Sequence, residues 1–316
     1  MLSSRTGGVC MSNRYPWLTI DPAGPFNLGP RTFPGRVWTA SGCFGYGLLG
    51  DDISAPGRAD PFAGIGTVVT KTITAAPRTG NPPPRVWATE FGALNSIGLE
   101  NMGVERFCDE VVPRLVERGI PFVASIAGTR PEEFGTLTRR LVVAAAAAPC
   151  WHGVELNLSC PNVARGGVDF GRDPLTVRAC VEAARGETED RVVLAKLTPN
   201  VASIAELARA AGEGGAHGLT AVNTLVGMDI DLRTGRPVLP RRRGGYSGGA
   251  ILPVALAKVD EIVQETGLPV VGVGGVRTAD DAAKFFAVGA SAVQVGTAQM
   301  DDPFAAADVA RALAAQ

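Results

Sequence analysis

The chain has 316 residues, of which 46% are hydrophobic, and its formal net charge is −1 at pH 7. This length suits one large α/β domain, and the lack of excess positive charge argues against a nucleic-acid or anionic-membrane surface. No apolar run approaches the ~20 residues of a membrane span, and the N-terminus lacks the apolar core of a secretion signal, so we expect a cytoplasmic protein.

Strands and helices are predicted to alternate after a polar leader. We expect residues 1–14 to be disordered and residues 15–316 to form one domain, with Met11 as a second candidate start. Short runs rich in Val, Ile and Ala predict strands at residues 37–40, 67–70, 122–126, 153–158, 191–196, 218–223, 269–273 and 292–295. Amphipathic stretches predict helices at residues 104–118, 131–148, 176–184, 201–212, 252–265 and 279–288.

This alternation predicts a parallel sheet covered by helices on both faces, because its strands are continuous apolar runs. The units fill nearly the whole chain, so we predict a single (β/α)8 TIM barrel with its active site at the C-terminal ends of the strands. A doubly wound open sheet is the structural alternative. Residues 73–101 and 227–249 are too long for simple connections, and long loops in compact domains tend to carry function.

Polar side chains follow several predicted strands. Lys71 and Lys196 each end an apolar run, and cations there suit an anionic cofactor or a substrate carboxylate. A lysine that merely extends toward solvent is the alternative for each. Asn223 and Thr224 end another strand and add an amide and a hydroxyl.

A thiol ends the strand at residues 153–158. Cys160 precedes Pro161, which cannot continue a strand, and lies near Asn157 and Ser159. A free cysteine is usually a small buried apolar residue. Beside the other polar strand ends, however, Cys160 is a candidate general base, a role open to a thiol whose pKa suits the working pH.

Two glycine turns follow the last two predicted strands. They contain Gly274-Gly275 and Gly296-Thr297, and glycines at such positions let backbone N–H groups approach a phosphate. One such turn means little, because glycine also serves tight turns, but two in successive late units are typical of phosphate-binding barrels. The spacing is not that of a dinucleotide-binding fingerprint.

Metal chemistry is not indicated. The 6 cysteines include no C-x-x-C pair, and the 2 histidines, His152 and His217, are not spaced as ligands. We therefore expect neither a metal nor an iron–sulfur cluster in this chain, and we expect both histidines to be structural.

Together these residues resemble the class 1 dihydroorotate dehydrogenases, most closely the class 1B (NAD-linked) catalytic subunit. The motifs that carry the resemblance are ASG at 40–42, TKT at 70–72, NPPPR at 81–85, LNSIGL at 94–99, NLSCPNV at 157–163, VNT at 222–224, GYSG at 245–248 and the two glycine turns. Gly166-Gly167 followed by Phe170-Gly171 favours class 1B over the fumarate-linked class 1A. Cys160 excludes class 2, whose base is a serine.

The resemblance implies that the barrel holds FMN and oxidises (S)-dihydroorotate to orotate in de novo pyrimidine (UMP) biosynthesis. Cys160 would be the general base while hydride passes to flavin N5, and Lys196 would stabilise the reduced ring. The implied substrate site comprises Lys71, Asn95, Ser96, Ile97, Gly98, Leu99, Asn157, Asn223 and Thr224. The implied FMN site comprises Ser41, Lys71, Thr72, Ser125, Asn157, Lys196, Val222, Gly248, Gly274, Gly275, Gly296 and Thr297.

The resemblance also implies partners. It predicts a homodimer and a heterotetramer with a second subunit that carries FAD and a 2Fe–2S cluster and passes electrons to NAD. Ser125 departs from the family, which usually has asparagine there. Asp229 replaces a usual small residue beside the substrate loop, where a carboxylate would repel an anionic ligand.

Two other functions stay open from the sequence. One is a related flavin-dependent dihydropyrimidine dehydrogenase that acts on uracil or thymine, whose substrate lacks the carboxylate. The other is a non-catalytic barrel that binds FMN or orotate.

Overall fold

Eight parallel strands close a barrel. The structure, a computed structural model, describes residues 18–48, 53, 60–159, 161–162 and 168–315. In spatial order the strands are β3 (Val37–Thr39), β4 (Thr67–Val69), β7 (Phe122–Ile126), β8 (Trp151–Asn157), β11 (Val192–Leu197), β12 (Gly218–Ala221), β17 (Val270–Val273) and β18 (Ala292–Val295), and β18 pairs with β3. The predicted (β/α)8 barrel is confirmed and the open sheet is excluded. The predicted leader, residues 1–14, lies outside the described residues.

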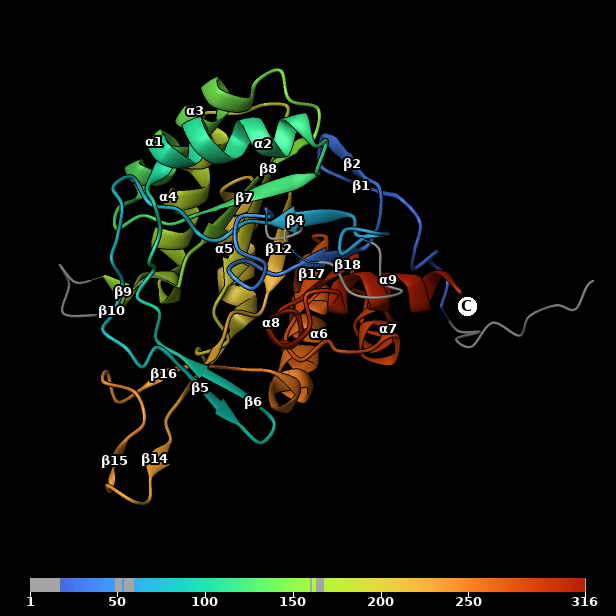
Figure 1. The fold of residues 1–316 in the computed structure, drawn as a ribbon. Helices are drawn as coiled ribbons and strands as arrows, with labels where there is room; N and C mark the ends of the chain where they lie inside the picture. The colour runs from blue at the N-terminus through green and yellow to red at the C-terminus, as the bar shows by residue number, and fades with distance from the viewer. Residues whose placement is uncertain (1–17, 49–52, 54–59, 160, 163–167, 316) are drawn as a thin grey trace, which may run out of the picture.

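Helices cover the outside of this barrel (Figure 1). Their bounds are α1 (Val104–Arg106), the π-helical η2 (Phe107–Val111), α2 (Val112–Glu117), α3 (Pro131–Ala145), η4 (Phe170–Arg172), α4 (Pro174–Arg185), α5 (Ile204–Glu213), η5 (Gly249–Ile251), α6 (Leu252–Thr266), α7 (Ala279–Ala287), α8 (Thr297–Asp301) and α9 (Ala305–Ala314). The alternation of the sequence does not predict α8 and α9, which follow the last barrel strand. No helix in the described part of the chain is long and apolar enough to cross a membrane.

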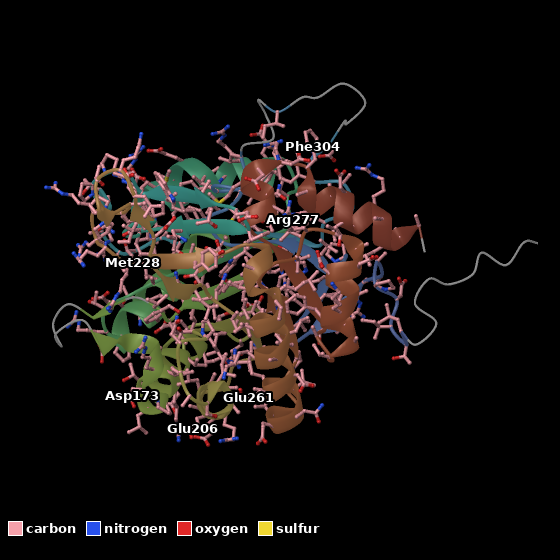
Figure 2. The ribbon with its side chains drawn as sticks, turned by 90° about the horizontal axis from the view of Figure 1, so that it is seen from below. Asp173, Glu206, Met228, Glu261, Arg277 and Phe304 are labelled. Atoms are coloured by element: carbon pink, nitrogen blue, oxygen red, sulfur yellow. The ribbon has the colours of Figure 1, made fainter. Side chains whose placement is uncertain are left out.

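The N-terminus of α5 is held by its own cap and by a side chain of α6. Ser203, the N-cap residue before α5, accepts a hydrogen bond from the backbone N–H of Glu206. Glu261, on α6, accepts the backbone N–H groups of Ile204 and Ala205 at 3.0 and 3.3 Å. Figure 2 shows Glu206 and Glu261 close together at this junction. An acidic side chain at a helix N-terminus also compensates the helix dipole.

A hairpin closes the N-terminal end of the barrel. It consists of β1 (Phe26–Leu28) and β2 (Arg31–Phe33). The ring of Phe33 stacks on that of Trp38 with centroids 4.6 Å apart. Arg31 donates to the backbone oxygen of Trp151, at the start of β8, at 3.0 Å. The interior at this end of the barrel is an apolar core, made of Phe26, Leu28, Phe33, Trp38, Val69, Val123, Val192, Leu194, Val271 and Ala292.

A four-stranded antiparallel sheet arises from the two long connections. Its order is β13 (Leu225–Gly227), β16 (Gly244–Ser247), β6 (Gly92–Asn95) and β5 (Val86–Thr89). The hairpin of β14 (Ile230–Asp231) and β15 (Arg236–Pro237) extends from it, away from the barrel (Figure 1). The short strands β9 (Pro161–Asn162) and β10 (Val168–Asp169) also pair. The sequence predicts the two long connections, residues 73–101 and 227–249, as functional loops, but it predicts neither their strands nor β9 and β10.

Burial keeps both histidines neutral. The ring of His152 packs edge-on against Phe33 with centroids 4.5 Å apart. Burial, with Arg31 and Arg191 acting in the same direction, lowers the pKa of His152 to about 4. Burial, with a smaller effect of Arg185, lowers the pKa of His217 to about 4. Both side chains are packed into the fold, which agrees with their predicted structural role.

We expect the free energy of unfolding to fall as the pH is lowered from about 6.5 toward 4. The unfolded histidines, with pKa near 6.5, take up protons that the folded chain excludes, so this contribution is complete above pH 6.5 and is lost below it. For His152 the loss should be on the order of 2 kcal/mol at pH 5. Urea denaturation at pH 7 and pH 5 measures it, and His152→Gln should be less pH-dependent than the parent. Equal pH dependence in the two proteins would contradict this prediction.

Candidate active site

A cavity of about 280 Å³ opens at the C-terminal ends of the barrel strands. The sheet of β5, β6, β13 and β16 contributes to its wall through β5, β6 and β16. The predicted site residues that line it are Ser41, Lys71, Thr72, Asn95, Ile97, Leu99, Asn157, Lys196, Val222, Asn223, Thr224, Gly248, Gly274, Gly275, Gly296 and Thr297. Residues far apart in the sequence are thus brought together, as the barrel prediction requires.

A hydrogen-bonded hydroxyl cluster forms one side of the cavity floor. Ser41 donates its hydroxyl to the backbone oxygen of Thr70 at 2.8 Å. Thr72 Oγ1 lies 3.1 Å from Ser41 Oγ and 2.8 Å from Ser125 Oγ, and it accepts from Asn157 Nδ2 at 3.2 Å. Because the Ser41 proton is used on Thr70, Thr72 donates to Ser41 and accepts from the other two. Its one donor and two acceptor positions are then filled.

The amides continue this network across the floor. Asn223 Nδ2 donates to Asn157 Oδ1 at 3.2 Å, and Asn223 Oδ1 accepts the backbone N–H of Thr224 at 2.9 Å. These contacts fix which end of each amide is the donor. Asn157 and Asn223 therefore present oriented polar groups to the cavity.

Lys71 and Lys196 reach the cavity in different electrostatic states. Lys196 Nζ lies 3.3 Å from Glu155 Oε1 in a buried ion pair. The cavity-lining carboxylate Glu100 is paired with Arg85 at 2.6 Å. Lys71, by contrast, makes no ion pair or side-chain hydrogen bond with another described residue. Lys71 is thus the cavity-lining cation left without an acidic partner in the described part of the chain, which suits an anionic ligand.

The two glycine turns meet at the cavity wall. Gly274 and Gly275 follow β17, Gly296 and Thr297 follow β18, and these strands are neighbours. Gly275 has φ +83°, and a Cβ there would lie 2.7 Å from Leu252 Cβ, so only glycine fits without strain. The arrangement predicted for a phosphate, two backbone turns side by side, is therefore present.

The antiparallel sheet packs closely on the barrel. Within the sheet, Asn95 Nδ2 donates to the backbone oxygen of Gly245 at 3.2 Å. Gly245 lies so near Thr224, which follows β12, that a Cβ there would collide with the Thr224 hydroxyl. Asn200, after β11, donates to the backbone oxygen of Thr224 at 2.9 Å. This close packing holds Asn95 and Thr224 at the cavity.

Three predicted site residues, Ser96, Gly98 and Ser125, do not line the cavity but contact residues near it. Ser125 is fully buried and contacts Thr72 through its hydroxyl. Ser96 Oγ accepts from Asn81 Nδ2 at 3.0 Å, and Gly98, with φ +73°, packs against Asn81. Ser96 and Gly98 thus shape the turn that presents Ile97 and Leu99. Cys160 and Gly166-Gly167 lie outside the described residues.

Asp229 is not among the residues that line the cavity. Its Oδ2 accepts from Trp87 Nε1 at 3.1 Å and its Oδ1 accepts the backbone N–H of Ile230 at 2.8 Å. The side chain joins the base of the β14–β15 hairpin to β5 and does not line the cavity. This geometry does not support the repulsion expected from the sequence.

The sequence reasoning missed two groups of residues. The first completes the cavity lining and comprises Ala40, Gly42, Cys43, Val86, Ala93, Glu100, Ser247, Ile251, Val273 and Met300. Burial raises the pKa of the Cys43 thiol, with Lys196 acting in the opposite direction, so this thiol keeps its proton at neutral pH. The second group lies below the floor and comprises Glu155, Thr220 and Gln294, all buried in the barrel.

The site favours a large ligand with polar and anionic parts. Gly42 lines the cavity, and a Cβ there would meet no atom within 4 Å, so the cavity is open beside this residue. Oriented amides, hydroxyls and lysine lie on the floor, and the glycine turns lie beside them. Among the residues that the structure describes, no group of three His, Cys, Asp or Glu side chains forms a metal site.

Comparisons with known proteins agree with this architecture. A family model described as dihydroorotate dehydrogenase matches residues 27–316. The catalytic subunits of dihydroorotate dehydrogenase B (NAD(+)) from Bacillus thuringiensis and Bacillus mycoides are each 43% identical over 265 residues, which is 84% of this chain and 82% of each relative. A crystal structure of DHODH in complex with ferulenol from Eimeria tenella has a TM-score of 0.72 and 21% identity, and covers 93% of this chain and 84% of that one. At that identity the likeness supports the fold alone.

Proposed function

Because the chain belongs to the dihydroorotate dehydrogenase family, we propose that it oxidises (S)-dihydroorotate to orotate as the catalytic subunit of an NAD-linked, class 1B enzyme. The observation that carries the proposal is the cavity at the barrel mouth. Lys71, which is unpaired among the described residues, lines this cavity together with the oriented amides of Asn157 and Asn223. The reaction serves de novo pyrimidine (UMP) biosynthesis in the cytoplasm.

The residues present fit FMN. Gly274-Gly275 and Gly296-Thr297 would hold its phosphate, because adjacent backbone turns at strand ends favour that anion. The remaining residues assigned to it are Ser41, Lys71, Thr72, Ser125, Asn157, Lys196, Val222 and Gly248, with Ser125 acting through Thr72. When bound, FMN supplies the hydride acceptor that no side chain can provide.

The substrate site is assigned to the other side of the same floor. Asn95, Asn157, Asn223 and Thr224 supply donors and acceptors that match the amides of a dihydropyrimidine ring. Lys71 would contact both the substrate and FMN. Ile97 and Leu99 would line the substrate site, and Ser96 and Gly98 would shape the turn that holds them there. Cys160, three residues after Asn157, is assigned as the general base that takes the proton from C5.

The proposal includes partners. Relatives at 43% identity are named as catalytic subunits of an NAD(+)-linked enzyme, which supports a separate electron-transfer subunit for this chain. We assign FAD and a 2Fe–2S cluster to that subunit, and a homodimer of this chain to the centre of a heterotetramer. Gel filtration of this chain with and without the co-expressed partner tests both assemblies.

We expect the purified chain to be yellow and its flavin absorbance to bleach anaerobically on addition of dihydroorotate. NAD added afterwards should not reoxidise it, because the electron-transfer subunit is missing. Anaerobic absorbance spectra recorded after each addition make the measurement, with uracil and thymine in their dihydro forms as controls.

The outcomes separate the alternatives. Bleaching by dihydrouracil or dihydrothymine but not by dihydroorotate would favour the enzyme that acts on uracil or thymine. A flavin that no substrate reduces would favour the non-catalytic barrel, and a chain without flavin would overturn the FMN assignment.

A further inference from the structure

A polar layer lies inside the barrel directly beneath the cavity floor. Glu155 is fully buried on β8, and its carboxylate is reached from three other strands. Lys196 Nζ on β11 lies 3.3 Å from Glu155 Oε1, and Thr220 Oγ1 on β12 donates to Oε2 at 2.9 Å. Gln294 Nε2, on β18 across the barrel, donates to the same Oε2 at 2.7 Å.

Both oxygens of the Glu155 side chain are held by donors. All three partners donate to the carboxylate, and a carboxylate can only accept, so the contacts match in direction. Gln294 is held in one orientation, because its Nε2 faces Glu155 while its Oε1 lies 3.4 Å from Lys196 Nζ. Thr220 and Gln294 thus hold the carboxylate, and the carboxylate holds the ammonium.

Lys196 connects this layer to the cavity. Its side chain is 8% exposed and that of Glu155 is 0% exposed, and Lys196 lines the cavity whereas Glu155 does not. An ammonium alone would offer a full positive charge to whatever lies on the floor. Paired with a buried carboxylate, it offers a donor group with little net charge, and the difference is large where water is excluded.

We propose that Glu155 is a positioning residue that holds Lys196 at the cavity floor and offsets its charge, thereby lowering the reduction potential of the bound flavin. The proposal rests on the FMN site proposed above. Reduction would add negative charge to a bound flavin, so an unpaired ammonium at the cavity would favour the reduced form. Glu155 would limit that preference by offsetting the charge of Lys196.

The test is the midpoint potential of the flavin in Glu155→Gln, measured by anaerobic titration against reference dyes at one fixed pH for all variants. We expect the ratio of reduced to oxidised flavin at a given potential to increase at least tenfold. For a two-electron couple this is a rise of about 30 mV in the midpoint potential. The same substitution in a Lys196→Met background should change the ratio less than threefold, because an unpaired buried carboxyl takes up a proton. The effect of Glu155 should therefore depend on Lys196.

Matched variants separate charge from packing. Thr220→Val removes one donor to Glu155 and should also raise the midpoint potential of the flavin, but by less. We expect the ratio of reduced to oxidised flavin to increase about threefold. This variant decides the question if Glu155→Gln fails to fold. Thr138→Val and Glu261→Gln alter a buried hydroxyl on α3 and a helix cap on α6, and should affect thermal stability without moving the potential.

Each outcome has one reading. A flavin-loaded Glu155→Gln with the parent potential would overturn the inference, as would an equal shift with and without Lys196. If Glu155→Gln does not fold, a parent potential in Thr220→Val would overturn it. A parent chain that binds no flavin would instead overturn the proposed function, and this inference with it.

Discussion

Replacement of Cys160 by alanine is expected to slow the reduction of bound flavin by dihydroorotate by about 10²–10⁴-fold at pH 7, the usual contribution of a general base. The proton at C5 would have no acceptor, while the FMN contacts assigned to Thr72, Lys196 and the glycine turns would be unchanged. Anaerobic stopped-flow absorbance measures the rate, and flavin content measures cofactor binding.

The matched variants for this prediction are Cys160→Ser and Cys150→Ala. Serine should be slower than cysteine and should gain rate further into the alkaline range, because its pKa is poorly matched to neutral pH. Cys150 precedes β8, at the opposite end of the strand from the cavity, so its replacement should keep the parent rate and pH profile. A parent rate at pH 7 in Cys160→Ala would show that another group takes the proton.

The apolar runs in the sequence were sufficient to predict the strands of the barrel. The apolar run at residues 122–126 coincides with β7, and the run at 292–295 coincides with β18. Such strands are buried on both faces, so their apolar continuity is visible in the sequence alone. The sheet at the cavity mouth was not predictable in this way. Its pairs join distant residues such as Leu94 and Tyr246, and β16 begins with two glycines, which carry no strand signal.

The site was predictable where a motif supplied the residues. The family resemblance pointed to Lys71, Asn157 and Asn223, and the structure brings these three to one cavity. Glu155 lies within the same predicted strand as Asn157, but the sequence reasoning missed it. A single acidic residue in an apolar run does not indicate which side chains will contact it. Its position, two residues before Asn157, places it on the same inward face, but the partners Thr220 and Gln294 come only from barrel closure. Sequence therefore predicts the residues at the strand ends better than those that hold them.

The second large effect is expected from Lys71. Lys71→Met should raise the KM for dihydroorotate and slow flavin reduction by about 10²–10³-fold, comparable to the loss of one donor that stabilises developing charge. The cavity's other charges are offset, since Lys196 is paired with Glu155 and Glu100 with Arg85. Lys71 has no such partner among the described residues. Because Lys196, the other lysine that lines the cavity, is paired with Glu155, it cannot replace the charge of Lys71.

Steady-state and stopped-flow kinetics of Lys71→Met, Lys71→Arg and the control Lys284→Met test this argument. Lys284 lies on α7 and is paired with Asp281 at the surface, with 53% of its side chain exposed, so its loss should leave the kinetics unchanged. Arginine keeps the charge but is bulkier and planar, and should recover substrate binding more than rate. The pH profile of Lys71→Met should keep the parent shape, because the proposed base is Cys160. A shifted profile would mean that Lys71 takes part in proton transfer, and a parent KM would mean that it does not bind the substrate.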